Sequence, residues 1–179
     1  AAMPDALTMT KVAGATLDVR FDWSALLGND TIAGVAWAVS GVTAGTPSNT
    51  TTTATQRISG GSAGTTATVE CTITTAASYV YVRTVAIDVV ASIDACEIIK
   101  ASGETISVPA PTWSDLNGDT IASYSWAAAA SLTIVSGGSA ATVVISGGTV
   151  GQDYALTCTI TTTAGQIDVR VIRVKVRRR

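Results

Sequence analysis

The stretch ISGGSAGTTATVECTITT (residues 58–75) decides the fold, because a close copy returns as ISGGTVGQDYALTCTITT (145–162). An earlier pair of stretches also matches: RFDWSALLGNDTIAGVAW (20–37) and APTWSDLNGDTIASYSW (110–126). Blocks that recur in the same order, one repeat length apart, indicate tandem duplication of one small domain. We therefore predict two domains, at residues 5–91 and 94–179.

Apolar and polar residues alternate within the repeated stretches. In the first copy Val69, Cys71 and Ile73 fall on one face, with threonines between them. The second copy has the same spacing, with Leu156, Cys158 and Ile160. Period-two alternation of this kind is typical of a strand with one buried face and one wet face. Many such short strands, separated by glycine-containing turns, predict an all-β antiparallel sandwich in each repeat.

Three further local features follow from the same patterns. Ala33, Val35 and Trp37 are expected to share one strand face. The last strand of each repeat changes the parity of its apolar residues, which predicts a β-bulge near residues 83–84 and again near 170–171. A single helical turn is expected at residues 24–27.

The tryptophans form two equivalent pairs. Trp23 and Trp37 recur as Trp113 and Trp126, and we expect all four to anchor the cores. Stacking on carbohydrate is the alternative, which would require exposed aromatic rings on a loop rim. Candidates for that role are Tyr79, Tyr81 and Tyr154.

Composition narrows the class of protein. Charged residues make up 13% of the chain, and its apolar runs fall well short of the ~20 residues that cross a membrane. The first ten residues lack the pattern of a secretory signal, so we expect a soluble protein that is not exported by that route. Cys71, Cys96 and Cys158 are expected to be free thiols in a reducing compartment.

Positive charge is concentrated at the C-terminus. The formal net charge is −2, yet six of the eleven basic residues lie within residues 170–179. This segment is either a solvated end of the last strand or an electrostatic dock for an acidic partner or a phosphate backbone. Without interleaved aromatic residues it does not favour nucleic-acid recognition. The contact candidates in it are Arg173, Lys175, Arg177, Arg178 and Arg179.

A second contact candidate is the polar stretch TAGTPSNTTTTATQ (43–56). It is the longest polar segment, and we expect either a loop that contacts a partner or a mobile tip. Its candidate residues are Thr46, Asn49 and Thr51.

No pattern in the sequence indicates chemistry. The chain has no histidine, which excludes Ser–His and Cys–His arrangements. Asp30 and Asp119 stand at equivalent places in glycine-containing turns, where capping of the turn is the expected role. We predict no catalytic residue, no cofactor site and no metal site.

Both repeats resemble a domain of tailed-phage virion proteins, the fibre–tail adaptors and minor structural proteins. The shared motifs are the Asp-Trp segment at 17–23, the Asp-Thr-Ile-Ala…Trp segments at 30–37 and 118–126, and the Gly-Gly…Ile-Thr-Thr segments at 59–75 and 146–165. The resemblance implies two tandem immunoglobulin-like domains and no enzymatic activity. It further implies docking to other virion proteins of tail and fibre. No membrane partner is expected, because the apolar runs are too short to span a membrane.

Three functions remain open at this point. A virion adaptor that joins fibre to tail, assembled in the host cytoplasm as part of a ring of copies, is the interpretation we favour. A capsid decoration protein that binds across capsid subunits is the second. A carbohydrate- or receptor-binding module is the third.

Overall fold

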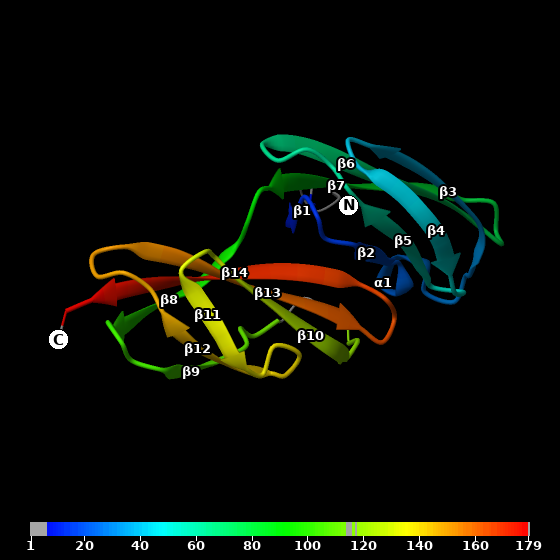
Figure 1. The fold of residues 1–179 in the computed structure, drawn as a ribbon. Coiled ribbons are helices and arrows are strands. Elements are labelled where there is room, and N and C mark those ends of the chain that lie inside the picture. The colour runs from blue at the N-terminus through cyan, green and yellow to red at the C-terminus, as the bar shows by residue number, and fades with distance from the viewer. Residues whose placement is uncertain (1–6, 114–115, 117, 179) are drawn as a thin grey trace. The chain divides into compact units, whose positions relative to one another are not determined.

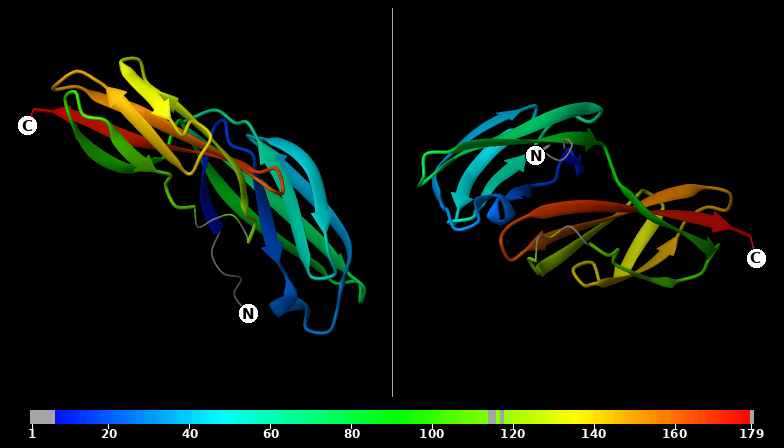
Figure 2. Two further views of the ribbon diagram at one scale, coloured as in Figure 1. Left: turned by 60° about the horizontal axis from the view of Figure 1, so that its bottom comes forward. Right: turned by 180° about the vertical axis from the view of Figure 1, so that it is seen from behind.

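The computed structural model describes residues 7–113, 116 and 118–178. The chain divides into two compact units, Ala1–Ala91 and Ser92–Arg179. Residues 5 and 6, where the first domain was predicted to begin, lie outside the described part. Each unit is a sandwich of a four-stranded and a three-stranded sheet (Figures 1 and 2). The prediction of two immunoglobulin-like β-sandwiches is confirmed.

Unit 1 consists of strands and one short helix. Its elements are β1 (Leu7–Val12), β2 (Leu17–Asp22), α1 (Ser24–Leu27), β3 (Ile32–Ser40), β4 (Thr43–Asn49), β5 (Thr53–Ser59), β6 (Thr65–Thr75) and β7 (Val80–Val90). One sheet has the order β1-β7-β6-β3 and the other β2-β5-β4, and β1 runs parallel to β7. The helical turn expected at residues 24–27 is α1.

Unit 2 repeats this topology. Its strands are β8 (Asp94–Ala101), β9 (Ile106–Pro109), β10 (Ile121–Ala128), β11 (Leu132–Ser136), β12 (Thr142–Gly147), β13 (Asp153–Thr162) and β14 (Ile167–Arg177). The sheets have the orders β8-β14-β13-β10 and β9-β12-β11, again with a parallel pair at one edge, β8 with β14. The duplicated sequence thus folds twice in the same way.

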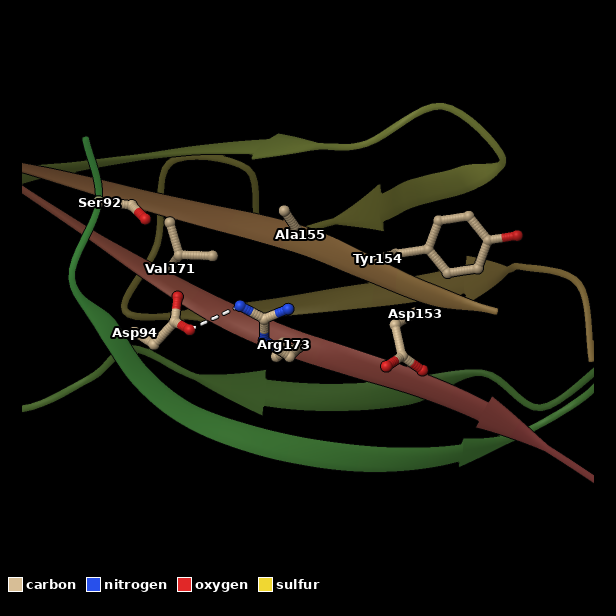
Figure 3. A pocket seen from close by; sticks show the side chains of 7 residues that line it. All are labelled: Ser92, Asp94, Asp153, Tyr154, Ala155, Val171 and Arg173. Atoms are coloured by element: carbon tan, nitrogen blue, oxygen red, sulfur yellow. Dashed lines mark hydrogen bonds and ion pairs between the residues drawn. The ribbon is translucent and has the colours of Figure 1, made fainter. Parts of the chain in front are cut away.

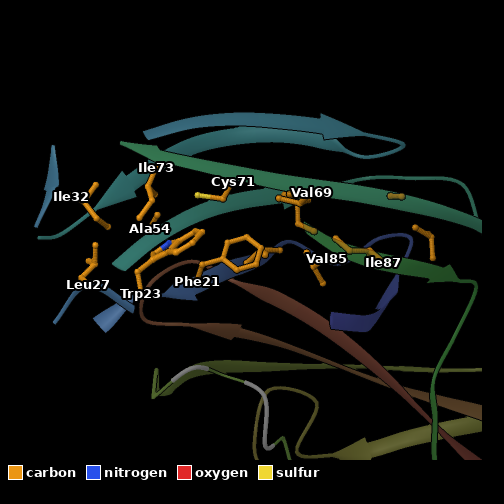
Figure 4. Packing of buried hydrophobic residues seen from close by; sticks show 14 residues of the cluster. Phe21, Trp23, Leu27, Ile32, Ala54, Val69, Cys71, Ile73, Val85 and Ile87 are labelled. Carbon is orange, nitrogen blue, oxygen red and sulfur yellow. The ribbon is translucent and has the colours of Figure 1, made fainter. Parts of the chain in front are cut away.

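The predicted alternation places the core between the sheets. Val69, Cys71 and Ile73 of β6 are fully buried, as are their counterparts in β13. Figure 4 shows Phe21 and Trp23 in the space between the two sheets of unit 1, beside Ala54 and Cys71. Apolar burial on this scale is the main term that stabilises a small domain.

The bulge predicted near residues 83–84 is absent, whereas β14 has a register shift beside the position predicted at residues 170–171. Pairing of β6 with β7 and of β13 with β14 is continuous, whereas β3 and β10 shift register at their first residues, between Ile32 and Gly34 and between Ile121 and Ser123. A further shift, between Val171 and Ile172, affects the pairing of β14 with β8. One consequence is that Ala33 is exposed and does not share the face of Val35 and Trp37.

The bulge prediction near residues 83–84 was wrong because polar residues occupy inward positions at the start of β7. Tyr81 and Arg83 face inward in β7, and the Arg83 guanidinium lies 4.3 Å from the centre of the Trp23 ring. Val80 and Val82 point outward, with exposed fractions of 61% and 37%. β7 therefore alternates without interruption, and its apolar residues point outward at its start and inward further along.

A buried lysine joins the two sheets of each unit. Lys11 on β1 donates from Nζ to the carbonyl oxygen of Gly60 at 2.7 Å, and Lys100 on β8 donates to that of Gly147 at 2.9 Å. Both side chains are fully buried. Each ammonium donates to one carbonyl oxygen of the Ile-Ser-Gly-Gly turn and to carbonyl oxygens beside its own strand, which gives that motif a structural role in both repeats.

The four tryptophans are not equally buried. Trp23 is fully buried and Trp126 nearly so, whereas Trp37 and Trp113 are half-buried. Trp37 still packs on the core, with its ring stacked on Phe21 at 5.9 Å between centroids. The expected role as core anchors therefore holds fully for one member of each pair.

Replacement of the two unit 1 tryptophans should separate these roles. Trp23→Ala is expected to lower the free energy of unfolding of unit 1 by about 3–5 kcal/mol, because it empties a fully buried site. Trp37→Ala should cost clearly less, since part of that ring already contacts water. Urea unfolding of both variants measures the difference, and equal losses would contradict the assigned burial.

Candidate docking surfaces

Most of the basic C-terminal residues lie on β14, and three of them have acidic partners on neighbouring strands. Arg173 contacts Asp94 at 2.7 Å, Lys175 contacts Glu97 at 2.7 Å, and Arg177 contacts Asp153 at 2.8 Å. These ion pairs run along the outer face of the four-stranded sheet of unit 2. We call this row of pairs the ion-pair ladder.

The ladder changes how the terminal charge can act. Exposed ion pairs of this kind contribute little to stability. Each acidic partner nevertheless neutralises one of the basic residues that, in the sequence, make up the excess of positive charge at the C-terminus. Arg178 is exposed beyond β14, and Arg179 lies outside the described residues. A partner that binds Arg173, Lys175 or Arg177 must therefore compete with acids of the same sheet.

An open hollow lies within the ladder. Its volume is about 410 Å³, and it is lined by Ser92, Asp94, Asp153, Tyr154, Ala155, Val171 and Arg173. Figure 3 shows the Arg173 guanidinium directed toward Asp94, with Asp153 on the other side. The hollow has negatively and positively charged side chains close together. Such a mixture suits contact with a polar protein surface more than binding of a single charged ligand.

The polar stretch at residues 43–56 is not a loop. Residues 43–49 form β4, an exposed edge strand, and residues 53–59 form β5, whose Gln56 is buried. The Gln56 amide donates to the carbonyl oxygens of Gly45 and Arg57 at 2.8 Å each, which fixes β4 on β5. The stretch is polar because both faces of β4 are exposed. Its contact candidates Thr46, Asn49 and Thr51 are all exposed.

The outer faces of the two four-stranded sheets differ. In unit 1 the outward residues of β6 and β7 are largely threonine, valine and alanine, and the acids Glu70 and Asp88 bond to threonine hydroxyls. At one end of this face Tyr79 and Val80 are each 61% exposed. The equivalent end of unit 2 has a buried Gln166 in place of the tyrosine. Unit 1 thus has an exposed tyrosine and valine at one end of its outer face, and unit 2 has the ladder further along its own outer face.

Of the three tyrosines considered for carbohydrate stacking, one has a largely exposed ring. Tyr79 lies 6.4 Å from Tyr81 between ring centroids, but Tyr81 is half-buried. Tyr154 is also half-buried, and its hydroxyl accepts a hydrogen bond from the backbone of Thr149 at 3.0 Å. These rings do not form the exposed rim that carbohydrate binding requires.

The turn aspartates bind backbone as predicted, and they also reach across to a second hairpin. Asp30 accepts from the N–H of Thr31 at 2.8 Å and of Ala77 at 3.4 Å. Asp119 accepts from the N–H of Thr120 at 2.8 Å and of Ala164 at 3.1 Å. Each aspartate therefore ties the turn before β3 or β10 to the hairpin that follows β6 or β13.

The described residues contain no group of three or more cysteine, aspartate or glutamate side chains able to hold a metal ion. Cys71, Cys96 and Cys158 are free thiols. Burial raises the pKa of Cys71 to about 12 and that of Cys158 to about 11, which keeps both in the unreactive thiol form. Cys96 is exposed.

The family described as "Podophage GP4 fiber-tail adaptor protein gp77" matches residues 11–88 and again residues 100–175. The chain belongs to this family. Each repeat matches on its own, so the family domain occurs twice here. Membership makes the chain a structural component of a phage virion, and it indicates interaction with other tail or fibre proteins.

Other comparisons add little. No curated protein matches the chain. The tandem immunoglobulin domains of DIP-gamma are 12% identical, cover 97% of this chain and 96% of their own, and superimpose with a TM-score of 0.35. For a chimeric titin Z1Z2 the identity is 11%, the coverages 98% and 96%, and the TM-score 0.36. Likeness this weak has no bearing on function. Within the described residues, no helix is long and apolar enough to cross a membrane.

The turn aspartates should make stability depend on acid pH. Hydroxyl groups of Thr162 and Thr163, with backbone N–H groups, hold the pKa of Asp119 well below 3.8. Because the folded pKa is depressed, the stabilisation is complete above the unfolded value and is lost as pH falls through the folded one. We expect the melting temperature to drop between about pH 5 and pH 2. Asp119→Asn should flatten this drop, and an unchanged profile would contradict the assignment.

Thiol labelling should follow burial. In the native protein iodoacetamide is expected to modify Cys96 alone, because the other two thiols are buried and protonated. Mass spectrometry after labelling in denaturant should then show all three cysteines modified. Native modification of Cys158 would show that the core of unit 2 opens.

Proposed function

We propose that the chain joins tail fibres to the phage tail by docking a different protein on each unit. The match of the adaptor family to both repeats carries the proposal. The two units share a scaffold but present different outer faces. A duplicated scaffold with two unlike surfaces suits a protein that must hold two unlike partners.

The chemistry of the two faces suggests how docking is divided. The unit 1 face, with Val80 and Val82 outward among threonines, suits a dry contact whose affinity comes from apolar burial. The ion-pair ladder of unit 2 suits a polar, orientation-setting contact in which the pairs exchange partners. Thr46, Asn49, Thr51, Arg178 and Arg179 remain proposed contact residues. On the virion the copies would be arranged in a ring that follows the symmetry of the tail.

Surface variants test this division in reconstitution. Tails that lack the adaptor would be mixed with the full chain, and electron microscopy would score bound adaptor and attached fibres. Val80→Lys/Val82→Lys and Arg173→Glu/Lys175→Glu are each expected to abolish one of the two attachments and to spare the other. Val135→Lys, at an exposed valine on β11, is the matched control.

Two outcomes would contradict the proposal. If the control and both surface variants attach fibres like the parent, neither face is a docking surface. If the protein copurifies with capsid shells in the copy number of the shell, the chain is a capsid decoration protein instead.

A further inference from the structure

Sheet edges are the places where a β protein meets another chain, because an edge strand has unpaired N–H and C=O groups. Proteins protect such edges with proline, charge, bulges, short strands or a covering loop. Each sandwich here has four edge strands, and they are protected unequally.

Most edges carry a recognisable protection. Inward lysines lie on β1 (Lys11) and β8 (Lys100), and charged residues alternate along β2 (Asp18, Arg20 and Asp22). Prolines occur in β4 (Pro47) and β9 (Pro109). β11 is short, with five residues, and its pairing has a register shift. Two edges, β3 and β10, have neither proline nor charge, and their register shifts lie at their first residues, away from the centre of the strand. They are the same strand in the two repeats.

A loop covers β10. The N–H of Trp126 donates to the carbonyl oxygen of Gly138 at 3.1 Å, and its indole Nε1 donates to that of Ala140 at 2.8 Å. Residues 137–141, between β11 and β12, thereby occupy the edge at its centre. Among the described residues, Trp37 has neither bond, and residues 33–40 make no backbone hydrogen bond outside their ladder with β6.

The registers of the two repeats show which groups of β3 are open. Trp126 pairs with Cys158, and Trp37 pairs with Cys71 at the equivalent place. Since the N–H of Trp126 faces away from β13, the N–H and C=O of Trp37 face away from β6. In an antiparallel ladder every second residue is oriented alike, so Val35 and Val39 share this orientation.

The sequence along this edge is nearly a palindrome. Residues 34–40 read GVAWAVS, with Trp37 at the centre, valine two residues away on each side and alanine between. Antiparallel pairing with a second copy about Trp37 would place Trp37 opposite Trp37, Val35 opposite Val39, and Ala36 opposite Ala38. Each residue then meets an identical partner, and no charge meets its like.

We infer that the free protein forms a two-fold dimer through β3, with a second copy of this chain as the partner. The contact joins two four-stranded sheets into one continuous sheet and pairs the open groups of Val35, Trp37 and Val39. It also covers the side chains of these residues, which are half-buried now because they line an open edge. β4, which contacts β3, is likewise uncharged and adds no charge repulsion to the approach.

A two-fold contact of this kind is self-limiting. Both copies use the same edge, so the dimer leaves no second β3 free and does not grow into a fibre. The inference goes beyond the proposed function, because it concerns the free protein and does not depend on attachment to a tail.

Sedimentation equilibrium of the full chain tests the dimer. The wild type is expected to be dimeric, and Ala36→Lys/Ala38→Lys is expected to weaken association by about tenfold or more, because lysines then face lysines. Both alanines are exposed, so folding should be unaffected, which circular dichroism checks. Ser125→Lys/Ala127→Lys at the equivalent sites of the covered strand β10 is the matched control. Mixing the lysine variant with Ala36→Glu/Ala38→Glu should restore dimers.

Crosslinking tests the register. In a Cys96→Ser background, Ala36→Cys and Ala38→Cys would be mixed and oxidised. Opposed residues of this pair type have Cα atoms about 4.5 Å apart, within the range of a disulfide. The mixture should give crosslinked dimer, and either variant alone should give little. A monomeric wild type, a dimer that the lysine variant leaves intact, or equal crosslinking in all three samples would overturn the inference.

Discussion

The structure depends on a buried ammonium group between the two sheets of each unit. Lys11 and Lys100 lie on the parallel edge strands, and their Nζ atoms reach the carbonyl oxygens of Gly60 and Gly147 beside the opposite sheet. A buried charge is tolerated only when its hydrogen bonds are met, so strand and turn cannot move independently. The turn must then follow a path that requires glycine. Gly147 has φ +81°, and a Cβ there would lie 2.5 Å from the Ser131 carbonyl oxygen.

This constraint separates scaffold from surface. The lysine, the glycine turn, the buried strand residues and the turn aspartates are shared by both repeats, and all of them contact the interior or a loop of their own unit. The outward residues have diverged, with an exposed Tyr79 in unit 1 where unit 2 has a buried Gln166. Folding constrains the shared set, whereas the outward residues that differ are free of that constraint.

The basic terminus shows why linear charge is a poor guide to a docking site. Arg173 pairs with Asp94, which is 79 residues away in the chain, and the sheet brings them to 2.7 Å. A sum over the last ten residues cannot include such partners. The same holds for the bulges, because a change in apolar parity can mean a bulge or polar residues turned inward. In β7 the position of Arg83 over the Trp23 ring shows that a polar residue is turned inward.

The sequence by itself determined the duplication, the all-β class, the buried faces of β6 and β13, the helical turn and the capping aspartates. These depend on residues close together in the chain, where period-two alternation and turn chemistry are local. It did not show that residues 43–49 form a strand, that three terminal bases are paired, or that β3 is open while β10 is covered. Only the tertiary structure decided these, because each depends on which strands become neighbours, and backbone and charge pairing between strands is set by contacts distant in sequence.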